Sequence, residues 1–247
     1  MTNAFTPCNG RFPALLALPV MFFAAGRMSA AVSALCLTAA AALSFGATLL
    51  SSKLLTATVL KGASSSFILE LPPYRVPQVG KVIVRSLLDR TVFVLGRAAA
   101  VAAPAGLILY LAANVSAEGR SLLLHLTDFL DPFARLLGLD GVILAAFLFG
   151  MPANEIVLPV ALAVYAAAGG AAGSMREVFI MSGWTPVTAV CVMLFTLMHW
   201  PCATALWTAY RETGSLKWTA AAFFLPTAFG MAACFLVASA ARLFGAA

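Results

Sequence analysis

Two long apolar stretches of this chain are each interrupted by a short polar break that contains a proline. The first break covers residues 150–155 (GMPANE) and the second covers residues 198–202 (MHWPC). A proline removes a helical hydrogen bond and leaves backbone carbonyls free. Polar side chains at membrane depth are costly, and by default they indicate a transport pathway. Paired broken helices therefore predict the binding site of a transporter.

The composition places the chain in the membrane. Hydrophobic residues make up 62% of its 247 residues, charged residues make up 10%, and the mean hydropathy is +0.99. A soluble domain of this length cannot enclose so many apolar side chains. The net charge of +6 does not predict a nucleic-acid partner, because the basic residues flank apolar segments. The five cysteines are scattered singly, which favours free thiols or ligands over a disulfide frame.

The apolar runs predict an all-α, polytopic membrane protein with discontinuous helices. We expect an apolar helix over residues 12–25, spans over 28–50, 91–113 and 218–240, an amphipathic helix over 121–137, broken spans over 142–168 and 187–210, a linker over 169–183 and a polar hairpin over 211–217. Basic residues concentrate between positions 53 and 97, so the positive-inside rule places the loop there on the cytoplasmic side.

The breaks carry side chains that bind metal ions. Glu155 and Asn154 offer oxygen, and His199 and Cys202, three residues apart, would share one face of a continued helix. This mixture of oxygen, nitrogen and sulfur suits Fe(II), Mn(II) or Zn(II) better than Mg(II) or Ca(II). The pattern leaves one alternative open, since a membrane histidine beside a tryptophan also serves as a hydrogen-bonding residue between helices.

A third break lies at the start of the chain, where the Pro-Cys pair at positions 7 and 8 repeats the one at 201 and 202. Four motifs, in this order, resemble the membrane region of the bacterial ferrous iron transport protein B family. They are PCNGRFP at residues 7–13, ELPPYR at 70–75, PANEIV at 152–157, and HWPC at 199–202 followed by ETGSLKW at 212–218.

The resemblance implies an Fe(II) permease of the bacterial inner membrane, built from two gate repeats. Residues 1–60 would be the end of the first repeat with two apolar helices, 61–90 a cytoplasmic basic loop, and 91–247 the second repeat. The metal would pass along the broken helices as substrate, with no permanently bound cofactor. The resemblance assigns Cys8 to the first repeat and Glu155 and Cys202 to the second. Together with the other donors of the breaks, the predicted metal ligands are Cys8, Asn9, Asn154, Glu155, His199 and Cys202.

The family also carries an N-terminal G-domain that gates these repeats, and no phosphate-binding loop of that kind occurs in this sequence. We therefore expect no enzymatic activity. Besides the lipid bilayer, the expected partner is a separate subunit that supplies the G-domain and the missing helices; a homo-oligomer is a further alternative. Two other functions stay open: a nucleoside-type gate transporter, and a non-transporting, truncated fragment of an iron permease.

Overall fold

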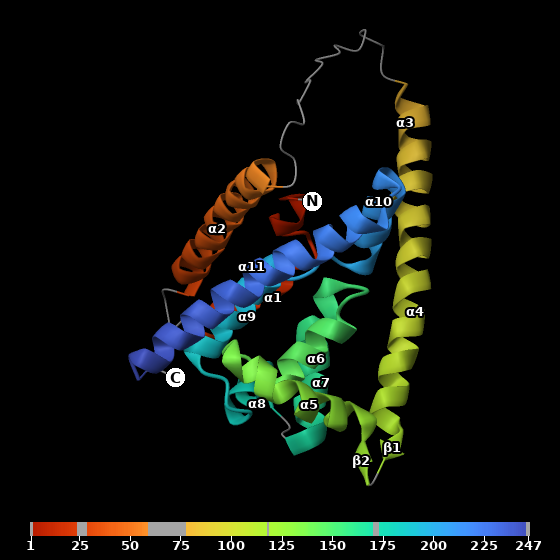
Figure 1. The fold of residues 1–247 in the computed structure, drawn as a ribbon. Helices are drawn as coiled ribbons and strands as arrows, with labels where there is room; N and C mark the ends of the chain where they lie inside the picture. The colour runs from red at the N-terminus through yellow and green to blue at the C-terminus, as the bar shows by residue number, and fades with distance from the viewer. Residues whose placement is uncertain (1, 24–28, 59–77, 118, 170–172, 246–247) are drawn as a thin grey trace.

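The computed structural model describes residues 2–23, 29–58, 78–117, 119–169 and 173–245. These residues are almost wholly helical, which confirms the predicted all-α fold (Figure 1). One small exception was not predicted. Two two-residue strands, β1 (Ser116–Ala117) and β2 (Arg120–Ser121), pair antiparallel at one end of the molecule, with Ser116 opposite Ser121.

The N-terminal part begins with a short 3₁₀ turn, η1 (Thr2–Phe5), followed by α1 (Phe12–Phe22) and α2 (Ser29–Thr58). Helix α2 runs past the predicted end at residue 50. The hydroxyls of its last turns bond back to earlier carbonyls, as Thr56 does to Ser52 at 2.9 Å. Because these polar side chains are satisfied within the helix, they do not end it.

Most of the predicted basic loop, residues 61–77, lies outside the described residues. The remainder is helical: α3 (Val79–Arg85), a π-helical turn η3 (Ser86–Val92) and α4 (Phe93–Asn114) follow one another without interruption. Together they form one long rod at the side of the molecule (Figure 1). The helix predicted over residues 91–113 is therefore the C-terminal part of a longer one.

The first predicted break is confirmed. After α5 (Leu122–Leu136), helix α6 (Gly141–Phe149) ends before the break, and a 3₁₀ turn η4 (Asn154–Ile156) leads into α7 (Val157–Gly169). The predicted linker over residues 169–183 is wrong in part, because it contains helix α8 (Met175–Met181). Ser174 and Glu177 cap this helix reciprocally, a Ser-x-x-Glu signature that is readable in the sequence.

The second break is also confirmed. Helix α9 (Pro186–Met198) ends at His199, and α10 (Ala203–Thr213) begins after Cys202. The backbone is extended at both break residues, with ψ of 179° at His199 and 157° at Cys202. A turn at Gly214, with φ of +60°, leads into α11 (Leu216–Leu243).

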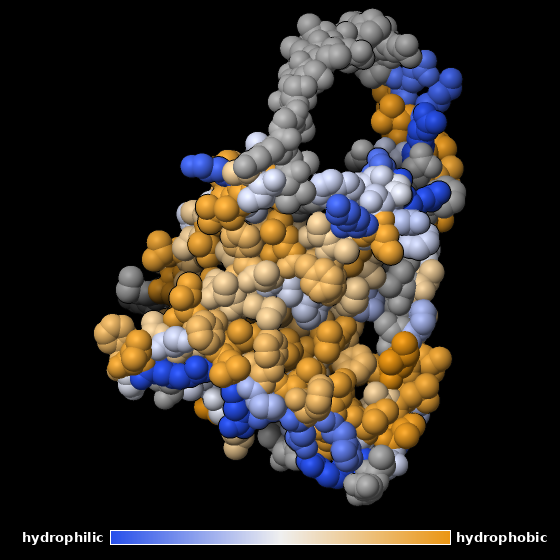
Figure 2. All heavy atoms as spheres, viewed as in Figure 1, coloured by the Kyte–Doolittle hydropathy of each residue, from blue (hydrophilic) through white to orange (hydrophobic). Residues whose placement is uncertain are grey.

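Among the described residues, three segments are long and apolar enough to cross a membrane: Ala30–Thr58, Pro186–Thr213 and Leu216–Leu243. The second of these includes the α9–α10 break. A fourth arises if α5 and α6, bent by 109° at their junction, form one broken span. Hydrophobic residues fill the middle of the view in Figure 2, and hydrophilic residues gather towards its upper and lower ends. The fold is that of a multi-pass membrane protein.

The core lies where α9 packs against α11 and α1, and where α6 packs against α5 and α7. Phe147, Phe179 and Phe195 are fully buried there. Two glycines allow backbones to approach closely. A Cβ on Gly230 would lie 3.0 Å from the carbonyl oxygen of Met198, and one on Gly141 would lie 1.9 Å from that of Thr127. The sharp α5–α6 bend therefore depends on a glycine at position 141.

We predict that Gly141→Ala lowers the free energy of unfolding by about 3 kcal/mol or more, because a rigid backbone carbonyl occupies the position of the new methyl group. The melting temperature of the purified protein in detergent measures this. Gly46→Ala is the matched control, since nothing lies within 4 Å of a Cβ at that exposed position of α2. Equal melting temperatures for the two variants would contradict the prediction.

Candidate functional site

The three proline-containing breaks meet in the structure. The backbone N–H of Ala203, after the second break, donates to the carbonyl of Met151 in the first at 2.8 Å. The Asn154 side chain lies 3.3 Å from His199 Nε2 and 3.8 Å from Cys8 Sγ. Segments separated by more than 140 residues therefore form one polar centre within apolar surroundings.

A cavity of about 300 Å³ opens at this centre. Three of the six predicted ligands line it, namely Cys8, Asn154 and Cys202, one from each break. Cys8 is exposed and Cys202 is half-buried. The cavity thus presents two sulfur atoms and one amide group, together with the wall residues Ala4, Thr6, Pro7, Arg11, Pro201 and Ala205.

Glu155 and Asn9 lie outside the residues that line this cavity. Asn154 is buried while the next residue, Glu155, is exposed, because the two point in different directions from the η4 turn. The Glu155 carboxylate lies against the N-terminal segment, so that a Cβ on Gly10 would be 2.8 Å from its Oε2. Asn9 is the exposed neighbour of that glycine.

His199 lies behind Asn154, away from the cavity lining, and is only 1% exposed. Its Nδ1 is 2.9 Å from the carbonyl oxygens of Phe195 and Thr196, to which it donates. The Asn154 amide bridges the imidazole and the Cys8 thiol. Its Oδ1 is the atom that faces Nε2, and its Nδ2 donates to Cys8 Sγ. His199 orients Asn154.

The helical argument that paired His199 with Cys202 was wrong. Residues 199–202 are extended, so a spacing of three does not place these side chains on one face. The rings of Phe147, Phe195 and Trp200 surround the imidazole instead, with ring centroids 4.9, 5.9 and 5.8 Å away.

Sequence reasoning missed Arg11, which is 2% exposed and lines the cavity. Its guanidinium donates to four backbone carbonyls at 2.9–3.2 Å: those of Ala4, Leu197, His199 and Trp200. The signal was available, because an arginine directly before an apolar helix and beside a Pro-Cys pair is an ionisable residue at membrane depth.

Within the described part of the chain, no three His, Cys, Asp or Glu side chains gather closely enough to hold a metal ion. An ion in the cavity would have the two thiols and the Asn154 amide as its side-chain donors and would complete its shell with backbone oxygen or water.

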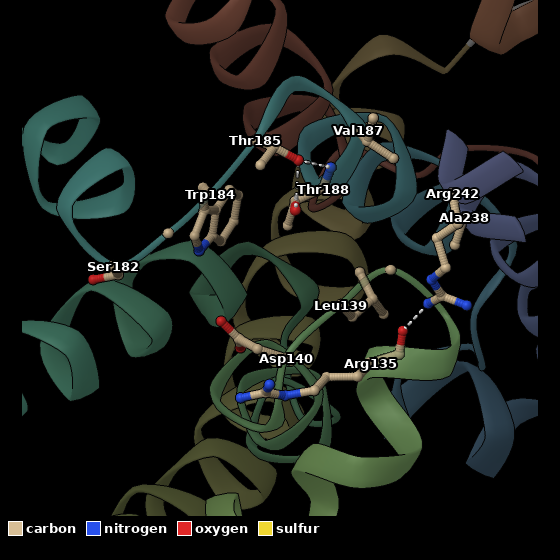
Figure 3. A pocket seen from close by; sticks show the side chains of 12 residues that line it. Arg135, Leu139, Asp140, Ser182, Trp184, Thr185, Val187, Thr188, Ala238 and Arg242 are labelled. Carbon is tan, nitrogen blue, oxygen red and sulfur yellow. Dashed lines mark hydrogen bonds between the residues drawn. The ribbon is translucent and has the colours of Figure 1, made fainter. Parts of the chain in front are cut away.

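A second cavity, of about 530 Å³, lies between the α5–α6 turn, the α8–α9 turn and the end of α11 (Figure 3). Its polar groups are used in capping these turns. Arg242 donates to the carbonyl of Arg135, and Thr185 accepts from the backbone N–H of Thr188. Asp140 accepts from Tyr165 and from the N–H of Ile143. Two arginines and one engaged carboxylate make this cavity unsuited to a metal cation.

The fold and the polar centre define a helical, multi-pass membrane protein whose broken helices meet at a thiol-lined cavity. The family model described as "Ferrous iron transport protein B C terminus" matches residues 37–89. A protein of Staphylococcus aureus (strain COL) named Fe(2+) transporter FeoB is 27% identical over 247 residues, covering 97% of this chain and 36% of that protein.

Two further proteins that are also named Fe(2+) transporter FeoB are similar to this chain. The protein from Leptospira biflexa is 24% identical, and the match covers 76% of this chain and 30% of that protein. The protein from Synechocystis is 27% identical, and the match covers 64% of this chain and 26% of that protein. No solved structure matches the chain. The chain is therefore similar to the C-terminal membrane region of FeoB proteins, in keeping with its multi-pass helical fold. It spans about a third of the length of these relatives.

We predict that His199→Phe lowers the free energy of unfolding by about 1–3 kcal/mol, because the Thr196 carbonyl and the Asn154 amide each lose a partner in a buried site. The melting temperature in detergent measures this loss. His125→Phe is the control, since His125 is half-buried and makes one bond, to the carbonyl of Ser121. If both variants melt like the parent, His199 does not hold the two breaks together.

Proposed function

We propose that this chain is the membrane part of a ferrous iron permease and that Fe(II) passes the cavity between the two helix breaks. The observation that carries the proposal is the convergence of Cys8, Asn154 and Cys202, from three distant segments, on one cavity. The relatives named Fe(2+) transporter support Fe(II) as the cargo.

The donor set favours a borderline or soft divalent ion. Thiolate sulfur binds Fe(II) well, whereas Mg(II) prefers oxygen and releases its water reluctantly. Both thiols must lose a proton to bind the metal, so affinity falls as the pH falls. A nucleoside would instead need a larger surface of polar and aromatic groups, which this cavity of about 300 Å³ lacks among its lining residues.

In this proposal the remaining predicted ligands do not bind the ion inside the cavity. His199 positions the Asn154 amide through its Nε2 contact. Glu155 and Asn9 lie beside Gly10, outside the cavity lining, where the carboxylate attracts the cation before it reaches the thiols.

We further propose the two-repeat organisation implied by the motifs. Residues 1–60 and 91–247 contribute to a first and a second gate repeat, and residues 61–90 face the cytoplasm. In this arrangement a G-domain, on a separate subunit or on further chain, controls access to the cavity.

Replacing both cavity cysteines with serine tests the role of sulfur. We predict that the Cys8→Ser/Cys202→Ser variant reduces iron-55 uptake about tenfold or more in a cell lacking other iron transporters, with a G-domain partner co-expressed, because serine keeps the size but loses the thiolate. Fe(II) should also protect the parental thiols from a small alkylating reagent. The control is Cys36→Ser, since Cys36 lies on α2 and lines a separate apolar groove. Parental uptake by the double variant would refute sulfur ligation.

Glu155→Gln removes a charge while keeping the shape of the side chain. We predict that iron uptake falls steeply, about fivefold or more, while the amount of protein in the membrane stays constant, because the carboxylate attracts the cation and is exposed. Glu212→Gln, at an exposed position near the end of α10, should leave uptake unchanged. A parallel loss of uptake and abundance would make Glu155 a folding residue.

A further inference from the structure

Arg11 is a buried cation within the proposed cation pathway. Its Nη1 donates to the carbonyls of Ala4 and Leu197, and its Nη2 donates to those of His199 and Trp200. We call these four oxygens the carbonyl cage. The guanidinium binds the carbonyl cage at the wall of the cavity, because Arg11 is one of the residues that line it.

The carbonyl cage has the properties of a cation site. Three of its oxygens come from the end of α9 and the extended residues behind it, where helical bonding stops and Pro201 has no N–H to donate. The carboxyl end of a helix is the negative end of its dipole. Unwound carbonyls at half-helix ends are the groups with which membrane transporters coordinate ions.

The guanidinium has no fixed anion beside it in the described part of the chain, where no carboxylate forms an ion pair with Arg11. The thiols of Cys8 and Cys202 line the same cavity as the guanidinium. A buried charge without a counterion is costly. Its position is therefore stabilised by the carbonyl cage and by thiolates when these form.

Further polar groups of the same break are not engaged. Among the described residues, the buried side-chain polar atoms without a hydrogen-bond partner are Arg11 Nε, Thr196 Oγ1 and Trp200 Nε1. These residues are 2%, 4% and 6% exposed, and all belong to the break or contact it. Buried polar atoms in native proteins are nearly always paired.

We propose that the carbonyl cage is a cation site, occupied in this conformation by the Arg11 guanidinium, and that the guanidinium and the transported divalent cation exclude one another there. The second part rests on the proposed function. Arg11 is then a specificity-determining residue: its charge opposes any cation that does not gain compensating bonds to the thiolates.

Arg11→Ala empties the carbonyl cage of its tethered cation and tests the first part without transport. In detergent, the variant should melt about 5 °C or more below the parent, and guanidinium chloride at about 10 mM should restore at least half of that loss. Sodium chloride and urea at the same concentration should not. Arg11→Lys, whose ammonium stays in the cage, should show no such response.

Arg176→Ala is the matched control, because Arg176 also donates to a backbone carbonyl, that of Met21 at 2.7 Å, but is exposed. It should neither lose stability nor respond to guanidinium. If Arg11→Ala does not accumulate in membranes, Arg11→Gln is carried through the same titration and must show the same rise. A loss of stability that guanidinium does not restore overturns the cation site.

Equilibrium binding of Fe(II) to the purified protein under anaerobic conditions tests the second part. Arg11→Ala should bind Fe(II) about tenfold more tightly than the parent, and added guanidinium should weaken that binding competitively. Unchanged or weaker affinity overturns the mutual exclusion. If guanidinium restores stability while neither protein binds Fe(II), the proposed function fails and the cation site stands.

Discussion

The contact between Arg11 and the carbonyls that follow α9 is the interaction on which the site depends. It joins residue 11 to residues 197–200 and so brings the Cys8 segment to the break that carries Cys202. Free carbonyls and a guanidinium are each expensive to bury alone in an apolar core. Their pairing removes both costs at once. The N-terminal segment thus supplies a donor for the carbonyls that the break leaves free.

The same reasoning applies to the other junction. Residues 150–155 interrupt an apolar run, and the Asn154 amide finds partners on His199 and Cys8. His199 in turn is held by two carbonyls of α9 and by three aromatic rings. A buried polar network is stabilising when its members are all paired. These bonds join the three breaks, so the segments that carry the two thiols are held more rigidly than unconnected loops would be.

The sequence predicted the helices and both breaks, because apolar periodicity and proline act locally. It also indicated Cys8 and Cys202 through the repeated Pro-Cys pair, and the structure places both on one cavity. The direction of His199 could not be predicted from spacing, since the extended backbone there depends on contacts with distant segments. Arg11 was missed for the same reason: three of its four carbonyl partners lie 186 or more residues away. Helix α8 was missed although its Ser174–Glu177 capping box is local.

A fixed positive charge beside a cation pathway is a filter in the proposed permease. A divalent ion in the cavity and the guanidinium that lines it repel by roughly a few kcal/mol at an effective dielectric constant of about 20. Two thiolates bound directly to the ion outweigh this repulsion, because they lie much closer to the ion than Arg11 does. An ion that binds sulfur weakly, such as Mg(II), gains little from the thiolates and meets the same repulsion. The arginine thus sharpens the preference that the cysteines set, by making entry unfavourable for every cation that does not bind both of them.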